Sequence, residues 1–157
     1  MTEQPIAIVE RHILNRAHRA LDHVLVRIET TAEMAGTVAG PELSSLVRNV
    51  LDAVDTTLLP HMEWEDQVCY PETDHLAGTL WATQLLRLQH ERIRSYLDQL
   101  RADELVLRDA AGHRAVIDLR AHLYALHAFL TSHLEQEEHV LLTLLVAAPA
   151  APRVEAS

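Results

Sequence analysis

The sequence has few of the residues that cross-link or interrupt a chain. Its 157 residues include one cysteine, four glycines and 4% aromatic residues. The single cysteine, Cys69, excludes an intramolecular disulfide, which is typical of proteins from a reducing cytoplasm. The scarcity of glycine and the abundance of Leu, Ala, Val, Glu and Arg favour long helices. The length fits one domain with its own core.

Basic residues are scarce as well. The chain has 13 Lys and Arg against 23 Asp and Glu, and its formal net charge is −10. Because phosphate binding needs a basic face, we expect no nucleic-acid partner. No apolar run is long enough to span a membrane, and the first residues lack the pattern of a signal peptide. We therefore expect a cytoplasmic protein with no membrane partner.

Prolines and glycines divide the chain into four long segments with helical spacing of apolar residues. We expect helices from about Pro5 to Ala35, Pro41 to Tyr70, Leu76 to Ala102 and Arg114 to Ala148. Pro60 predicts a kink inside the second helix, Pro71 predicts its end, and residues 103–113 are expected to form a connection. These segments predict an all-α fold, an antiparallel up-down four-helix bundle over residues 1–148, with a short disordered tail over 149–157.

Histidine is unusually frequent, with eleven copies. Two octapeptides, HMEWEDQV at 61–68 and HLEQEEHV at 133–140, each place a glutamate four residues after a histidine, on the same face of a helix. The offset from the first octapeptide to the second is the same as the offset from His18 to His90. The repeat thus selects two sets of three residues: His18, His61 and Glu65, and then His90, His133 and Glu137.

None of the other seven histidines has a second histidine at this offset. In an up-down bundle the six selected residues lie at similar heights, within about 8 Å of one another along the helix axes. A buried layer of two carboxylates and four imidazoles is costly unless the charges are paired or bind metal. Such ligands suit iron as well as zinc or manganese. We therefore predict two metal ions, which Glu65 and Glu137 are well suited to bridge.

This arrangement resembles the hemerythrin family, specifically its HHE cation-binding branch, over about residues 8–145. The family pattern is a histidine, His-x-x-x-Glu, a second histidine and a second His-x-x-x-Glu, and LLPHMEWEDQVCYP also resembles the family's second helix. The resemblance implies a non-haem centre of two iron ions with an oxo or hydroxo bridge, at which O2, hydrogen peroxide or nitric oxide binds. It implies that the metal ligands are His18, His61, Glu65, His90, His133 and Glu137.

The third helix departs from the pattern of hemerythrins proper. Those proteins carry a second histidine one turn away from the first, and the corresponding positions here are Leu86 and Arg94. One histidine fewer leaves a metal position that is either open or filled by another side chain. Candidates for that side chain are Asp22, Tyr96 and Tyr124.

Three functions fit the expected centre. The first is an oxidoreductase with peroxidase- or catalase-like activity in defence against oxidative or nitrosative stress, which the missing histidine favours. The second is a binding module, either a reversible oxygen carrier or a sensor of iron or oxygen. The third is a structural bundle that is metal-free or binds zinc. The sequence identifies neither an electron donor nor an oligomeric state.

Overall fold

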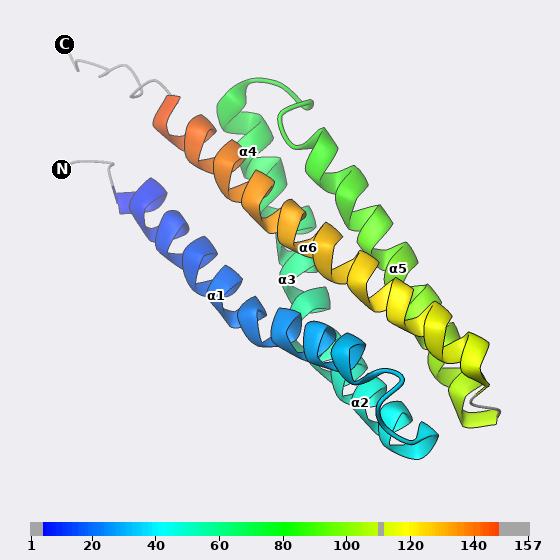
Figure 1. The fold of residues 1–157 in the computed structure, drawn as a ribbon. Coiled ribbons are helices and arrows are strands. Elements are labelled where there is room, and N and C mark those ends of the chain that lie inside the picture. The colour runs from blue at the N-terminus through cyan, green and yellow to red at the C-terminus, as the bar shows by residue number, and fades with distance from the viewer. Residues whose placement is uncertain (1–4, 110–111, 148–157) are drawn as a thin grey trace, which may run out of the picture.

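The computed structural model describes the backbone of residues 5–109 and 112–147 and the side chains of residues 16–108, 112–141 and 143. These residues form four helical stretches and contain no strand (Figure 1). The predicted all-helical bundle is therefore confirmed, while the antiparallel up-down order of its helices stays a prediction. The expected tail, 149–157, lies outside the described residues. Within the described part of the chain, no helix is both long and apolar enough to cross a membrane.

The four helical stretches have well-separated bounds. The first is α1, Pro5–Met34. The second runs without a break as α2 (Gly40–Ala53), the π-helical turn η1 (Val54–Leu58), α3 (Leu59–Trp64), the π-helical turn η2 (Glu65–Cys69) and α4 (Tyr70–Ala77). The third and fourth are α5 (Gln84–Asp109) and α6 (His113–Ala147). In Figure 1 the start of α1 and the end of α6 lie at the same end of the bundle as α4.

Each of the four helical stretches buries aliphatic side chains in a common core. Helix α6 packs along α1 and α5, and α2 packs along the same two helices. Fully burying one aliphatic side chain contributes about 1.5–3 kcal/mol. Because these side chains repeat every three or four residues, they match the spacing seen in the sequence. Members of the core include Leu21, Val24 and Ile28 of α1, Val47 and Val50 of α2, Ile93 and Leu97 of α5, and Leu123, Leu126 and Leu130 of α6.

The prediction that Pro71 ends the second helix is wrong. The amide of Tyr70 bonds the carbonyl of Glu65, five residues back, so the helix is already widened to a π turn where the proline follows. This widening accommodates a residue that lacks an amide hydrogen and crowds the preceding turn of an α-helix. The helix continues to Ala77 and ends at Gly78, whose φ of 67° is a left-handed conformation that glycine adopts without strain.

Pro60, where a kink is expected, also follows a π turn. The amide of Leu59 bonds the carbonyl of Val54, again five residues back. Each of the two π turns therefore ends two residues before a proline. The helix does depart from α-helical winding near Pro60, where a kink is expected, but the departure lies on the amino-terminal side of this proline.

The third helix begins later than predicted. Leu76 belongs to α4, and α5 starts at Gln84. Asp74 explains this start, because its buried carboxylate accepts hydrogen bonds from the amide and the hydroxyl of Thr83 at 2.9 and 3.0 Å. It thereby satisfies an amide that the first turn of a helix leaves without a partner.

The prediction of a connection over residues 103–113 is wrong for most of that range, because α5 continues to Asp109 and α6 begins at His113. Glu104 anchors the extension. Its carboxylate is 3% exposed and accepts hydrogen bonds from Ser44 of α2 at 3.2 Å and from Arg108 at 2.6 Å. A buried polar contact between helices thus holds a segment whose sequence looks like a loop.

Replacing Glu104 with Gln is expected to lower the free energy of unfolding by about 1 kcal/mol at pH 7, because hydrogen bonds to a charged group are the stronger ones. The Arg108 guanidinium, against the effect of burial, lowers the pKa of Glu104 below its ordinary value of 4.5. Such a carboxylate stabilises the fold above its unfolded-state pKa and loses that contribution as the pH falls through its folded-state pKa.

Urea unfolding of the two proteins between pH 7 and pH 3 measures this difference, which should shrink below about pH 4.5. Glu91→Gln, on the exposed side of the same helix, is the matched control. A difference that persists unchanged in acid would contradict the role given to the Glu104 charge.

Candidate metal centre

The six residues selected by the sequence repeat come together inside the bundle. All four helical stretches contribute, and the six side chains are at most 7% exposed. They are His18 of α1, His61 of α3, Glu65 of η2, His90 of α5, and His133 and Glu137 of α6. The structure therefore brings together every residue of the predicted set.

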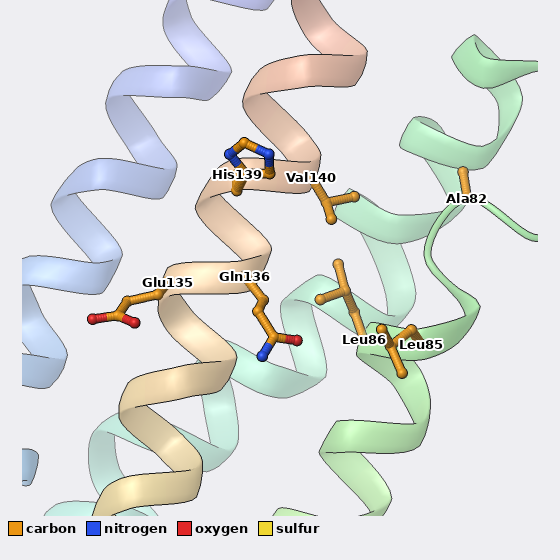
Figure 2. A pocket seen from close by; sticks show the side chains of 7 residues that line it. All are labelled: Ala82, Leu85, Leu86, Glu135, Gln136, His139 and Val140. Carbon is orange, nitrogen blue, oxygen red and sulfur yellow. The ribbon is translucent and has the colours of Figure 1, made fainter.

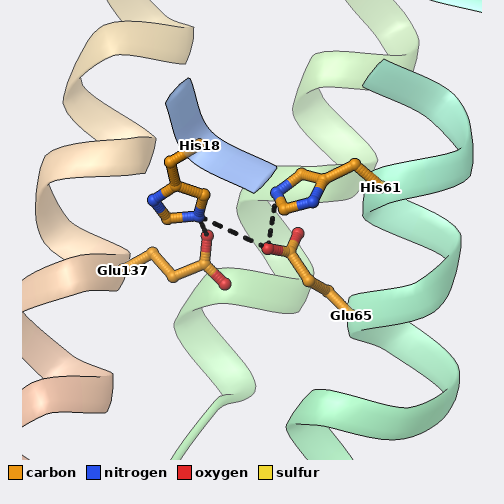
Figure 3. A group of neighbouring side chains, drawn as sticks. All are labelled: His18, His61, Glu65 and Glu137. Atoms are coloured by element: carbon orange, nitrogen blue, oxygen red, sulfur yellow. Dashed lines mark ion pairs between the residues drawn. The ribbon is translucent and has the colours of Figure 1, made fainter. Parts of the chain in front are cut away.

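The donor atoms of these residues form two groups that share Glu65. In the first group, His18, His61, Glu65 and Glu137 each offer one nitrogen or oxygen atom, and these atoms lie within 4.8 Å of one another (Figure 3). In the second group, Glu65 meets His90 and His133 within the same limit. A carboxylate that belongs to both groups is placed to bridge two ions.

Short distances inside the first group do not correspond to hydrogen bonds. Nε2 of His61 lies 2.7 Å from Oε1 of Glu65, and Nε2 of His18 lies 3.2 Å from Oε2 of Glu137. Yet both nitrogens and all four oxygens of the two carboxylates are buried without a hydrogen-bond partner. Buried polar groups left unpaired cost about 1–3 kcal/mol each. The atoms are thus arranged around a common space, as ligands of a cation are, and their chemistry fits a metal ion.

The carboxylates and imidazoles shift one another's protonation. Burial opposes a charge on His18, but the Glu137 and Glu65 carboxylates raise its pKa to about 10. Burial opposes a charge on Glu65 too, but the surrounding imidazoles lower its pKa far below the usual range. Burial, together with the nearby His90, lowers the pKa of His133 to about 3. Glu65 is therefore ionised and His133 neutral, as metal binding requires, whereas His18 holds a proton that a bound cation would displace.

Three of the four histidines donate their Nδ1 hydrogen to a side chain outside the centre. His18 donates to Glu138 at 3.1 Å, and His90 donates to Asp66 at 2.9 Å. His133 instead meets a neutral amide oxygen, that of Gln89, at 2.9 Å. Each contact fixes the orientation of the ring and leaves Nε2 directed at the centre.

Asp66 joins the centre to one of the positions that lack a second histidine. Its carboxylate accepts a hydrogen bond from Arg94 at 2.6 Å as well as from His90. Its backbone carbonyl accepts a further bond from Arg87 at 3.1 Å. Arg94 therefore holds the carboxylate that orients His90.

Tyr70 is part of the site and was missed from the sequence. Its hydroxyl lies 3.2 Å from Nε2 of His90, and its side chain is fully buried. In an uninterrupted α-helix it would lie about 140° around the axis from Glu65. The π turn absorbs one extra residue and reduces this angle to about 40°. Helical periodicity hides the residue, and the proline that follows it is the local sign of altered winding.

The phenol of Tyr70 keeps its proton in this environment. Burial is the main cause that raises its pKa, and the negative charges of Glu137 and Glu65 raise it further. The sequence suggested three other side chains for the open metal position, and none of them belongs to the buried donor groups. Asp22 is exposed, Tyr96 packs against Phe129, and Tyr124 is 39% exposed.

Comparison with known proteins agrees with this site. A family model described as the hemerythrin HHE cation binding domain matches residues 9–145, a range that contains all six residues and Tyr70. Neither the curated proteins nor the solved structures compared with the chain gave a match.

Replacing Asp66 with Asn is expected to weaken the binding of Co²⁺ by about 10–100-fold, the usual effect of removing a residue that orients a metal-binding histidine. The fold should be unchanged, because Asp66 lies at the edge of the core with 24% of its side chain exposed. Competition with a chelator of known affinity measures the change. Asp52→Asn, at an exposed position of α2, is the control. Equal affinities of the two variants would contradict the positioning role of Asp66.

Proposed function

Because this chain belongs to the hemerythrin HHE cation-binding domain family, we propose that it is a non-haem di-iron protein. In this proposal two iron ions share an oxo or hydroxo bridge and bind or react with O2, hydrogen peroxide or nitric oxide. The physiological role is defence against oxidative or nitrosative stress. The family and the buried His and Glu groups support the conclusion that the chain is a metal-binding protein.

The observation that carries the proposal is the pair of donor groups around Glu65. The buried Glu65 and Glu137 carboxylates have no hydrogen-bond partners, and imidazole nitrogens surround them. A cation in each donor group would offset the negative charge of these carboxylates. When bound, two iron ions supply Lewis acidity and exchangeable electrons.

The second donor group is the one suited to an external ligand. It contains three residues, whereas the first contains four. The hydroxyl of Tyr70 lies beside it, against Nε2 of His90, and carries a proton. A metal ion held by that nitrogen would leave the hydroxyl free to donate its hydrogen to another acceptor. A neutral donor in a buried site fits a small, oxygen- or nitrogen-containing ligand such as peroxide or nitric oxide.

The first test is the metal content of protein purified from iron-supplemented cells, together with its visible spectrum. We expect two iron ions per chain and the near-ultraviolet charge-transfer bands of an oxo-bridged diferric pair. His61→Ala and Glu137→Ala should each remove iron, because each deletes a donor. His75→Ala, at an exposed position of α4, should retain both ions. A folded protein that carries zinc, or no metal, would exclude the di-iron proposal.

Reactivity separates the candidate roles. The reduced, iron-loaded protein is expected to react rapidly with hydrogen peroxide or nitric oxide in a stopped-flow instrument. A stable oxygenated spectrum that persists through repeated cycles of oxygen removal would indicate a carrier instead. Inertness toward both peroxide and nitric oxide would contradict the defence role.

Replacing Tyr70 with Phe is expected to leave two iron ions bound and to slow the reaction with peroxide by about 100-fold, the usual cost of removing one hydrogen-bond donor from a reacting site. Iron analysis and stopped-flow spectroscopy of the same sample measure the two effects. Tyr96→Phe, whose ring packs against Phe129, is the control. Loss of iron from the Tyr70 variant would contradict a role limited to the bound ligand.

A further inference from the structure

Two surface pockets lie near the centre and differ in chemistry. One, of about 260 Å³, lies between α5 and α6, and its walls include the apolar side chains of Ala82, Leu85, Leu86 and Val140 (Figure 2). The other, of about 210 Å³, lies between α1 and α6. This second pocket, called the acidic pocket below, is lined by Asp22, Glu135 and Glu138, by Thr131, by Arg19 and by His18 of the metal centre.

Two exposed carboxylates, those of Asp22 and Glu135, lie at the mouth of the acidic pocket. Asp22 and Glu135 are exposed, and neither forms a hydrogen bond or ion pair with another residue that the structure describes. Figure 2 shows the Glu135 side chain extending from α6 toward α1, and Glu135 also lines the apolar pocket. Glu138, whose side chain is 46% exposed, accepts the hydrogen bond from His18. The carboxylates at the mouth are therefore free to meet a cation from solvent.

The inner wall of the acidic pocket provides an independent observation, because it is formed by a histidine of the centre and by an unpaired hydroxyl. His18 is 5% exposed, and its Nε2 has no hydrogen-bond partner although it lies 3.2 Å from Oε2 of Glu137. The hydroxyl oxygen of Thr131 is likewise buried and without a hydrogen-bond partner. One imidazole ring thus stands between the acidic pocket and the unpaired oxygens of the centre. The acidic pocket therefore reaches a residue of the centre.

We propose that the acidic pocket is the port through which a divalent metal cation reaches the centre, with Asp22 and Glu135 binding the ion transiently at the mouth. The inference rests on the proposed function, since it requires a centre that takes up metal. A cleft lined by charges of one sign raises the local concentration of the opposite ion and its association rate. Arg19 is the basic residue lining the pocket, and its charge opposes this effect.

The test is the rate at which the metal-depleted full chain takes up Co²⁺, with the fold checked by circular dichroism. The double variant Asp22→Asn/Glu135→Gln is expected to take up Co²⁺ about tenfold more slowly, with the same final number of ions bound. Arg19→Gln is expected to speed uptake. Glu33→Gln/Glu91→Gln, which neutralises two exposed carboxylates elsewhere, should match the unmodified chain.

Release of bound Co²⁺ to a chelator distinguishes a passage from simple attraction. Side chains that form a passage lower the barrier in both directions, so the double variant should also release Co²⁺ more slowly, by a similar factor. Attraction alone would slow uptake and speed release, and that result would overturn the port, as would uptake at the unmodified rate. The release measurement uses the loaded protein and therefore decides even where the metal-depleted chain unfolds. Failure of the unmodified chain to bind Co²⁺ would overturn the proposed centre itself.

Discussion

Two carboxylates in an apolar core, those of Glu65 and Glu137, are the constraint on which the bundle depends. An unpaired charge in such surroundings is prohibitively costly, so the fold must bring compensating groups to the same depth. It does so with one imidazole from each of the four helical stretches. The helices must therefore be correctly aligned along their axes, because a shift of one turn separates the donors by about 5 Å. The aliphatic stripes stabilise the bundle, and the polar layer fixes its register.

The two histidines of the second donor group, His90 and His133, are held differently. His90 donates to the ionised Asp66, which Arg94 also contacts, whereas His133 donates to the neutral amide of Gln89. An anionic partner makes an imidazole a stronger donor to a metal than a neutral partner does. Histidines of the same donor group thus present unequal electron density. Tyr70 adds a protonated phenol beside His90.

The sequence alone predicted the helical class and selected the six residues that meet inside the bundle, because a repeat at a constant offset and helical spacing are both one-dimensional properties. The sequence did not predict the features that depend on contacts between helices. The extension of α5 past residue 102 depends on Ser44 meeting Glu104 across the bundle. The partners of the histidine Nδ1 atoms depend on register in the same way. Tyr70 was missed for another reason, since an α-helical projection assigns it to the wrong face.

The π turn η2 has a consequence for how a duplicated pattern can diverge. The two His-x-x-x-Glu motifs are related by internal symmetry in the sequence, yet the first lies where the winding widens and the second lies in the regular helix α6. The counterpart of Tyr70 in the second copy is Leu142, and Thr143 stands directly after it where Pro71 follows Tyr70. A change in helical pitch, not in the ligands, therefore breaks the symmetry of the two copies. The six repeated residues remain matched while their surroundings become free to specialise.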